Sequence, residues 1–213
     1  MSLFLGKIHY WLFNKIKLTE SLEKELLTLA EAKGLPVEGY REVAFQQFEA
    51  PLPQASLESL IDHQNIHGWL QHRIAQAESR LAFYVTKILD AQPALKGDLM
   101  SLYDKQAQGA AEQTDTQPPT PESMLQAIHD FLLEGMPCDR AQQVLDNDGT
   151  KLAWKYEPCL HTDYWTAVEG DVTHYYDFRK QWIESYVTAL QPSWHYALSP
   201  EGVHEINREG SAK

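Results

Sequence analysis

Two histidines, His63 and His67, have the types and spacing in this chain that most directly suggest chemistry. They lie in the stretch DHQNIHGWLQHRIAQAESRLA, residues 62–82, where apolar residues recur at helical spacing. Histidines at positions i and i+4 of one helix can present two ring nitrogens to a single metal ion. The pair therefore predicts a site for one divalent metal ion, with Zn, Fe, Ni and Mn as candidates. The equal alternative is a pair of packed histidines that needs no metal.

A continuous helix over residues 56–91 would place both histidines in its apolar arc, facing the interior. Glu78 falls in the same arc, but about 16 Å along the axis from His67, too far to share one ion with the pair. Arg80 falls outside the arc. Further ligands must come from other segments, and the candidates are His9, His129 and His161. We assign His161 to the predicted metal site with His63 and His67.

The histidine spacing is similar to that of the DinB-like helical bundles, which hold a divalent metal with three histidines, two of them in an HxxxH pair. The resemblance covers only His63 and His67, and no third histidine matches by motif. It implies a metal site and is not counted as family membership. Gln64 stands where an HExxH metalloprotease would carry its glutamate, so that class of zinc enzyme is not indicated.

The stretch WKYEPCLHTDYWTAVEGDVTHYYDFRKQWIESY, residues 154–186, is rich in aromatic side chains. Such a stretch predicts either a core filled by large aromatic side chains or the wall of a small-molecule pocket. We assign to this predicted pocket four residues, Trp165, Tyr175, Trp182 and Tyr186. A nucleophilic pair of Cys159 and His161 is a weaker alternative, because residues i and i+2 of a helix do not face each other.

The first 18 residues hold three lysines, Lys7, Lys15 and Lys17, and no acidic residue. They predict an amphipathic helix, which either packs in the core with its lysines at the edge or lies on an anionic membrane surface. The segment is too short and too charged to span a bilayer, and it lacks the apolar run of a signal peptide.

The net charge of −12 argues against nucleic acid as a partner, since phosphate binding needs a basic surface. Neither Cys138 nor Cys159 lies in a CxxC pair, and two reduced thiols fit a cytoplasmic protein. No nucleotide-binding motif occurs. The sequence thus suggests a soluble metal-binding protein. A non-catalytic module for a small molecule or a protein, and a peripheral membrane protein, are the alternatives, and neither enzyme activity nor oligomeric state is specified.

Helical periodicity along the chain predicts an all-α fold, an antiparallel bundle with additional short helices and at most one small strand or hairpin near 150–157. A short helix is expected over 138–146. The whole chain, 1–213, is expected to be one helical domain. Its expected parts are an N-terminal helical half, 1–107, a flexible linker, 108–121, an aromatic-rich helical half, 122–198, and a loosely ordered tail, 199–213.

Overall fold

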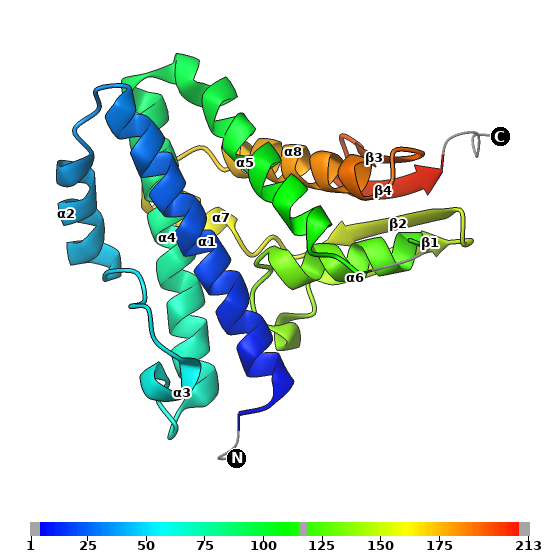
Figure 1. Ribbon diagram of the computed structural model, residues 1–213, viewed down its shortest axis with the longest axis horizontal. Coiled ribbons are helices and arrows are strands. Elements are labelled where there is room, and N and C mark those ends of the chain that lie inside the picture. The colour runs from blue at the N-terminus through cyan, green and yellow to red at the C-terminus, as the bar shows by residue number, and fades with distance from the viewer. Residues whose placement is uncertain (1–4, 116–118, 209–213) are drawn as a thin grey trace. The chain divides into compact units, whose positions relative to one another are not determined.

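The computed structural model describes residues 5–115 and 119–208 (Figure 1). Over these residues the chain forms α-helices and a four-stranded antiparallel sheet, arranged in two compact units. Among the described residues, the first unit comprises 5–97 and 161–172, and the second comprises 98–115, 119–160 and 173–208. The units therefore do not coincide with the expected halves 1–107 and 122–198.

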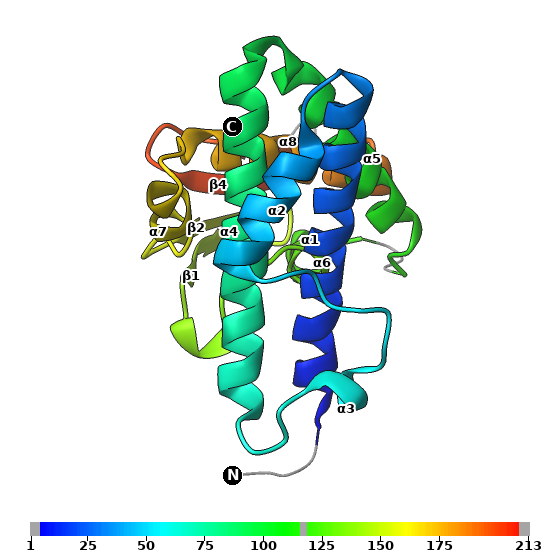
Figure 2. The same cartoon turned by 90° about the vertical axis from the view of Figure 1, so that its left-hand side faces the viewer.

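Two long helices, α1 (Lys7–Ala32) and α4 (Ile66–Ala91), lie side by side in the first unit (Figures 1 and 2). The helix α2 (Val37–Phe48) packs on α4, as does α7 (Thr162–Ala167), while α3 (Leu57–Leu60) is a single turn. Side chains at helical spacing fill the core between them, among them Leu12, Ile16, Leu26 and Ala30 of α1 and Leu70, Ile74, Ala77 and Ile88 of α4.

The N-terminal helix buries one of its lysines. Lys15 is 2% exposed, and its ammonium nitrogen lies 3.6 Å from the centre of the Trp11 ring, in cation–π geometry. The membrane-surface alternative for this helix stays a prediction. None of the helices in the described parts of the chain is long and apolar enough to cross a membrane.

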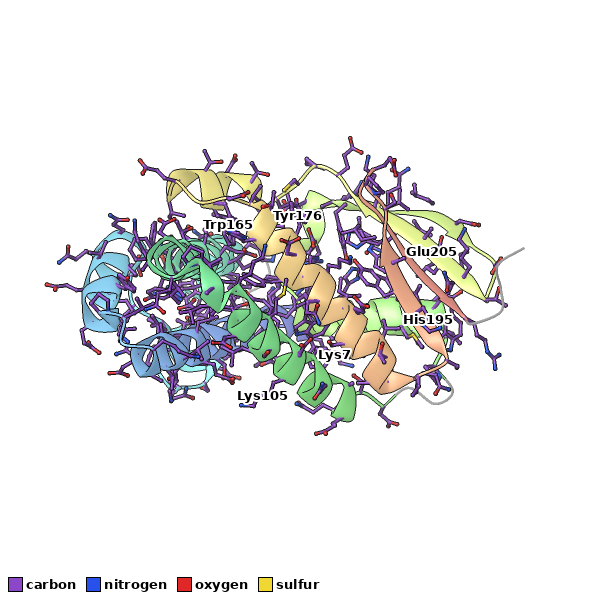
Figure 3. All side chains as sticks on the ribbon, turned by 90° about the horizontal axis from the view of Figure 1, so that it is seen from above. Lys7, Lys105, Trp165, Tyr176, His195 and Glu205 are labelled. Carbon is purple, nitrogen blue, oxygen red and sulfur yellow. The ribbon has the colours of Figure 1, made fainter. Side chains whose placement is uncertain are left out.

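The second unit combines three helices with the sheet. Its helices are α5 (Lys96–Glu112), preceded by a 3₁₀ turn at Pro93–Leu95, α6 (Pro121–Phe131) and α8 (Thr173–Leu190). A second 3₁₀ turn, Pro137–Asp139, precedes the strands β1 (Gln142–Asn147), β2 (Lys151–Tyr156), β3 (Trp194–Leu198) and β4 (Val203–Arg208). The strand order is β1-β2-β4-β3, with α8 packed on β3 and α6 in contact with β2. Figure 3 labels His195 on β3 and Glu205 on β4.

The all-α expectation is wrong, because the described residues include this sheet. The strand suggested near 150–157 is present as β2, but it is a central strand paired on both sides. The helix expected over 138–146 is replaced by a 3₁₀ turn and β1.

The expected loose tail from 199 carries β4, whose His204 and Ile206 are buried, while 209–213 lie outside the described residues. In the expected linker 108–121, α5 continues to Glu112, and 116–118 lie outside the description.

The single helix expected over 56–91 is also wrong, because the chain turns between Leu60 and Ile66. The Asp62 carboxylate accepts a hydrogen bond from the Gln64 amide at 2.8 Å, and the Asn65 side chain caps α4 by accepting from the Gly68 amide at 3.2 Å. A Cβ atom on Gly68 would lie 2.2 Å from the Asn65 Nδ2 atom, so the glycine leaves room for this cap.

Candidate functional site

The structure places His63 and His67 on different elements. His63 lies in the turn before α4, and its Nε2 is 3.0 Å from the Glu58 carbonyl oxygen. His67 is in the first turn of α4, and its Nε2 is 3.4 Å from the Nε2 of His9. The Gly6 amide donates to His9 Nδ1 at 2.9 Å, so a neutral His9 carries its proton on Nε2 and donates it toward His67. Burial, and then the charge of His67, lower the pKa of His9.

His161, the third predicted ligand, meets a buried carboxylate. Its Nδ1 lies 3.3 Å from Glu78 Oε2, and both side chains are under 5% exposed. Each predicted histidine thus faces a different partner: a backbone carbonyl, His9 or Glu78. Over residues 5–115 and 119–208, no group of three or more His, Cys, Asp or Glu side chains is arranged to hold a metal ion. Metal binding by these histidines stays a prediction.

The four predicted pocket aromatics are divided between the units. Trp165, on α7, belongs to the first unit and is buried (labelled in Figure 3). The other three lie on α8 in the second unit. Trp182 and Tyr186 stack with ring centres 5.2 Å apart, and their polar atoms bond to Gln106 and Thr114. The Tyr175 hydroxyl accepts from Arg179 at 2.8 Å. The α8 aromatics therefore take part in the packing of their own unit, and ligand binding by them stays a prediction.

A cavity lined by none of the predicted site residues opens in the first unit. Its volume is about 340 Å³, and it is lined by α1, α2, the segment 51–54 and one side chain of α4. The lining residues are Lys17, Glu20, Ser21, Glu23, Lys24, Leu27, Arg41, Phe45, Pro51, Leu52, Gln54 and Tyr84. Every one of them belongs to the first unit. The volume is at the lower end of the range of small-molecule sites, about 300–1,000 Å³.

Two glutamates and one arginine form an ion cluster at the buried end of this cavity. Arg80, 1% exposed, donates from Nε to Glu23 Oε2 at 2.9 Å and from Nη2 to Glu20 Oε1 at 3.1 Å. Its Nη1 donates to the carbonyl oxygens of Phe48 and Glu49 at the end of α2. Glu20 Oε1 also accepts from the Leu52 amide at 2.8 Å. The cluster thus joins α1, α4 and the segment after α2.

Three buried oxygens around the cavity have no hydrogen-bond partner among the described residues: Glu20 Oε2, Glu23 Oε1 and the Tyr84 hydroxyl. Glu23 is 2% exposed and Tyr84 is 1% exposed. A buried polar atom without a partner costs about 1–3 kcal/mol, so native proteins rarely hold several in one place without a reason. One reason is that a ligand supplies the missing hydrogen bonds.

Burial controls the protonation of these side chains. Burial raises the pKa of Glu23 to about 7, although the charge and hydrogen bond of Arg80 act in the opposite direction. Burial likewise raises the pKa of Glu20, against the Leu52 hydrogen bond and the Arg80 charge. The pKa of Tyr84 is also raised, by burial and then by the charge of Glu23. At neutral pH the Glu23 carboxyl is therefore only partly ionised, whereas the Tyr84 phenol stays protonated.

The signal for this site was present in the sequence. Buried positions of α1 recur three or four residues apart, and carboxylates take two places in that series: Leu12, Ile16, Glu20, Glu23, Leu27 and Ala30. Acids in an apolar stripe require a partner of opposite charge. That partner is Arg80, which the sequence predicts outside the apolar arc of its helix. It is nevertheless buried, because α4 is covered on most sides from Ala77 to Leu89.

Comparison of the chain with protein-family models, with curated proteins and with solved structures gave no match.

Proposed function

We propose that the first unit binds a small cationic molecule, an amine or a guanidinium compound, in the cavity of Glu20 and Glu23. The observation that carries the proposal is that three buried oxygens of residues lining one cavity of the described chain have no hydrogen bond, two of them, Glu23 Oε1 and the Tyr84 hydroxyl, having no ion pair either. An ionised carboxylate is purely an acceptor, and Arg80 bonds to one oxygen of each glutamate. An ammonium or guanidinium group brings several N–H donors and a positive charge to the remaining oxygens.

The electrostatic balance of the cluster supports a cationic ligand. Arg80 pairs with both glutamates, and the Lys17 ammonium, 3.8 Å from Glu20 Oε2, pairs with Glu20 alone, so Arg80 is the one cation paired with Glu23 in the described residues. Burial raises the pKa of Glu23, and the charge and hydrogen bond of Arg80 offset only part of that effect. A ligand cation beside Glu23 would add a second positive charge, and Glu23 would then lose its proton.

We expect n-butylammonium and n-butylguanidinium to raise the thermal unfolding midpoint of the full chain, whereas neutral n-butanol should not. At ten times the dissociation constant the stabilisation is about 1.4 kcal/mol. For a chain of this size that corresponds to a rise of about 3–6 °C. The measurement is a thermal unfolding series at increasing probe concentration.

The Glu20→Gln/Glu23→Gln variant should show no rise with either cation. Its matched control is Glu31→Gln/Glu42→Gln, which removes two exposed carboxylates of the same unit outside the cavity and should respond like the parent. No rise with either cation in the parent, or an equal rise in the Glu20/Glu23 variant, would contradict the proposal.

A cytoplasmic location is part of the same proposal. Cys138 and Cys159 are exposed thiols, and exposed thiols persist in a reducing compartment. Recovery of the protein in the membrane or extracellular fraction of intact cells would count against it.

A further inference from the structure

We infer that the ligand is a zwitterion whose cationic group binds Glu20 and Glu23 and whose anionic group binds basic side chains at the mouth of the cavity. This inference rests on the proposed function. It is carried by the order of charges from the buried end of the cavity to its exposed end, and by the unpartnered oxygens at the buried end.

The buried end of the cavity is acidic. Glu23 and Glu20 are 2% and 8% exposed, and each has one carboxylate oxygen without a hydrogen bond in the described structure, although Glu20 Oε2 lies 3.8 Å from the Lys17 ammonium. The Tyr84 hydroxyl, also without a partner there, adds a group that can both donate and accept. A ligand group that reaches this end meets acceptors and one hydroxyl.

The exposed end of the cavity is basic. Lys17 and Arg41 have side chains 24% and 30% exposed, and Lys24 is an exposed residue. Lys17 and Lys24 lie on the same face of α1, seven residues and about 10 Å apart, with Glu20 between them. Arg41 projects from α2 and pairs with Glu38, and the Lys17 ammonium lies 3.8 Å from Glu20 Oε2, while the Lys24 ammonium has no partner within the described part of the chain. The mouth therefore carries three basic side chains, and the charge of Lys24 is the one not paired.

This order of charges selects against a simple amine and fixes how a ligand enters. A molecule with only a positive charge is repelled by the unpaired Lys24, beside the paired Lys17 and Arg41, before it reaches the glutamates. A molecule with an anionic group at its other end replaces that repulsion by attraction. The charges thus orient the ligand with its cation inward and its anion outward.

Apolar side chains also line the cavity. Leu27 of α1 and Phe45 of α2 contribute to it, as do Pro51 and Leu52 of the following segment. Such a lining suits a short hydrocarbon chain. An ω-amino acid of about four carbons has this combination of ends and middle, and 4-aminobutanoate is a suitable probe.

The test compares 4-aminobutanoate with n-butylamine, which has the same chain length and ammonium group but no carboxylate. We expect calorimetry of the full chain to show about tenfold tighter binding of 4-aminobutanoate, the effect of one hydrogen bond to a charged group. The Lys24→Gln/Arg41→Gln variant should lose this advantage and bind n-butylamine more tightly than the parent, because two repelling charges are gone.

The matched control is Lys7→Gln/Lys33→Gln, which removes two lysines near the ends of α1 that do not line the cavity and should keep the tenfold advantage. Lys7 is labelled in Figure 3.

Binding of n-butylamine with no advantage for 4-aminobutanoate would overturn this inference and leave the proposed function standing. Binding of neither probe would overturn both. If the Lys24/Arg41 variant fails to fold, added salt replaces it: the parent's advantage should shrink with ionic strength, and a salt-independent ratio would contradict the inference.

Discussion

Replacement of Arg80 by methionine is expected to lower the free energy of unfolding by roughly 3–5 kcal/mol at neutral pH. The side chain is 1% exposed and bonds to both buried glutamates and to two backbone carbonyl oxygens. Methionine fills a similar volume but leaves Glu23 as a buried carboxyl without a paired cation, and Glu20 with only the Lys17 ammonium, 3.8 Å away. Urea unfolding of the full chain measures the loss, which should be smaller at lower pH, where the glutamates are protonated.

The triple variant Arg80→Met/Glu20→Gln/Glu23→Gln is the control for this prediction. It removes the charges together, and replacing a whole buried ion cluster by neutral side chains is often close to neutral for stability. We expect it to recover more than half of the loss. A loss below 1 kcal/mol in the single variant, or no recovery in the triple variant, would show that charge pairing does not hold α1, α4 and the segment after α2 together.

The Glu23 carboxyl is expected to make the protein about 3 kcal/mol less stable above pH 7 than below pH 4.5. Its pKa rises from the usual 4.5 to about 7 on folding, so the folded state binds more protons than the unfolded state between these values. The contribution is therefore fully present below about pH 4.5 and is lost as the pH rises through 7. This fall in stability with rising pH is opposite to the effect of a surface carboxylate stabilised by a salt bridge, which adds stability as the pH rises.

The measurement is the difference in free energy of unfolding between the parent and the Glu23→Gln variant across this pH range. The groups that act on Glu23 are Arg80 of α4 and Glu20 of α1, and both stay in place in the variant. Taking the difference cancels the titration of the other acidic residues. If the two stability curves run parallel between about pH 4.5 and 8, the Glu23 carboxyl has no raised pKa.

Local sequence signals account for the helices but not for the sheet. The apolar spacing of α1, α4 and α8 is that of ordinary packed helices. The strand β1 is an exposed edge with the polar sequence QQVLDN, so it has no inward-facing alternation. The strand β4 alternates, but His204 takes an inward position where an apolar residue is expected. Its partner β2 lies about 50 residues earlier, and such distant pairing leaves no mark in a local window.

The candidate site, too, could be predicted only where it depends on neighbouring residues of the sequence. Glu20 and Glu23 lie in the buried series of α1, so a buried acid could be recognised from the sequence. The contact with Arg80 could not, because 60 residues separate it from Glu20 and the helix expected over 56–91 had the wrong limits. In the same way, the histidine pair depended on one continuous helix, which the Asp62 and Asn65 turns interrupt.

The most direct test of cation binding at Glu23 is proton release on binding, measured by calorimetry of n-butylamine in buffers of different ionisation enthalpy at about pH 6.5. At that pH Glu23 is mostly protonated, while the amine stays charged. The predicted result is the release of most of one proton per bound amine in the parent, and none in Glu23→Gln. Binding without proton release in the parent, or equal release in the variant, would contradict the account.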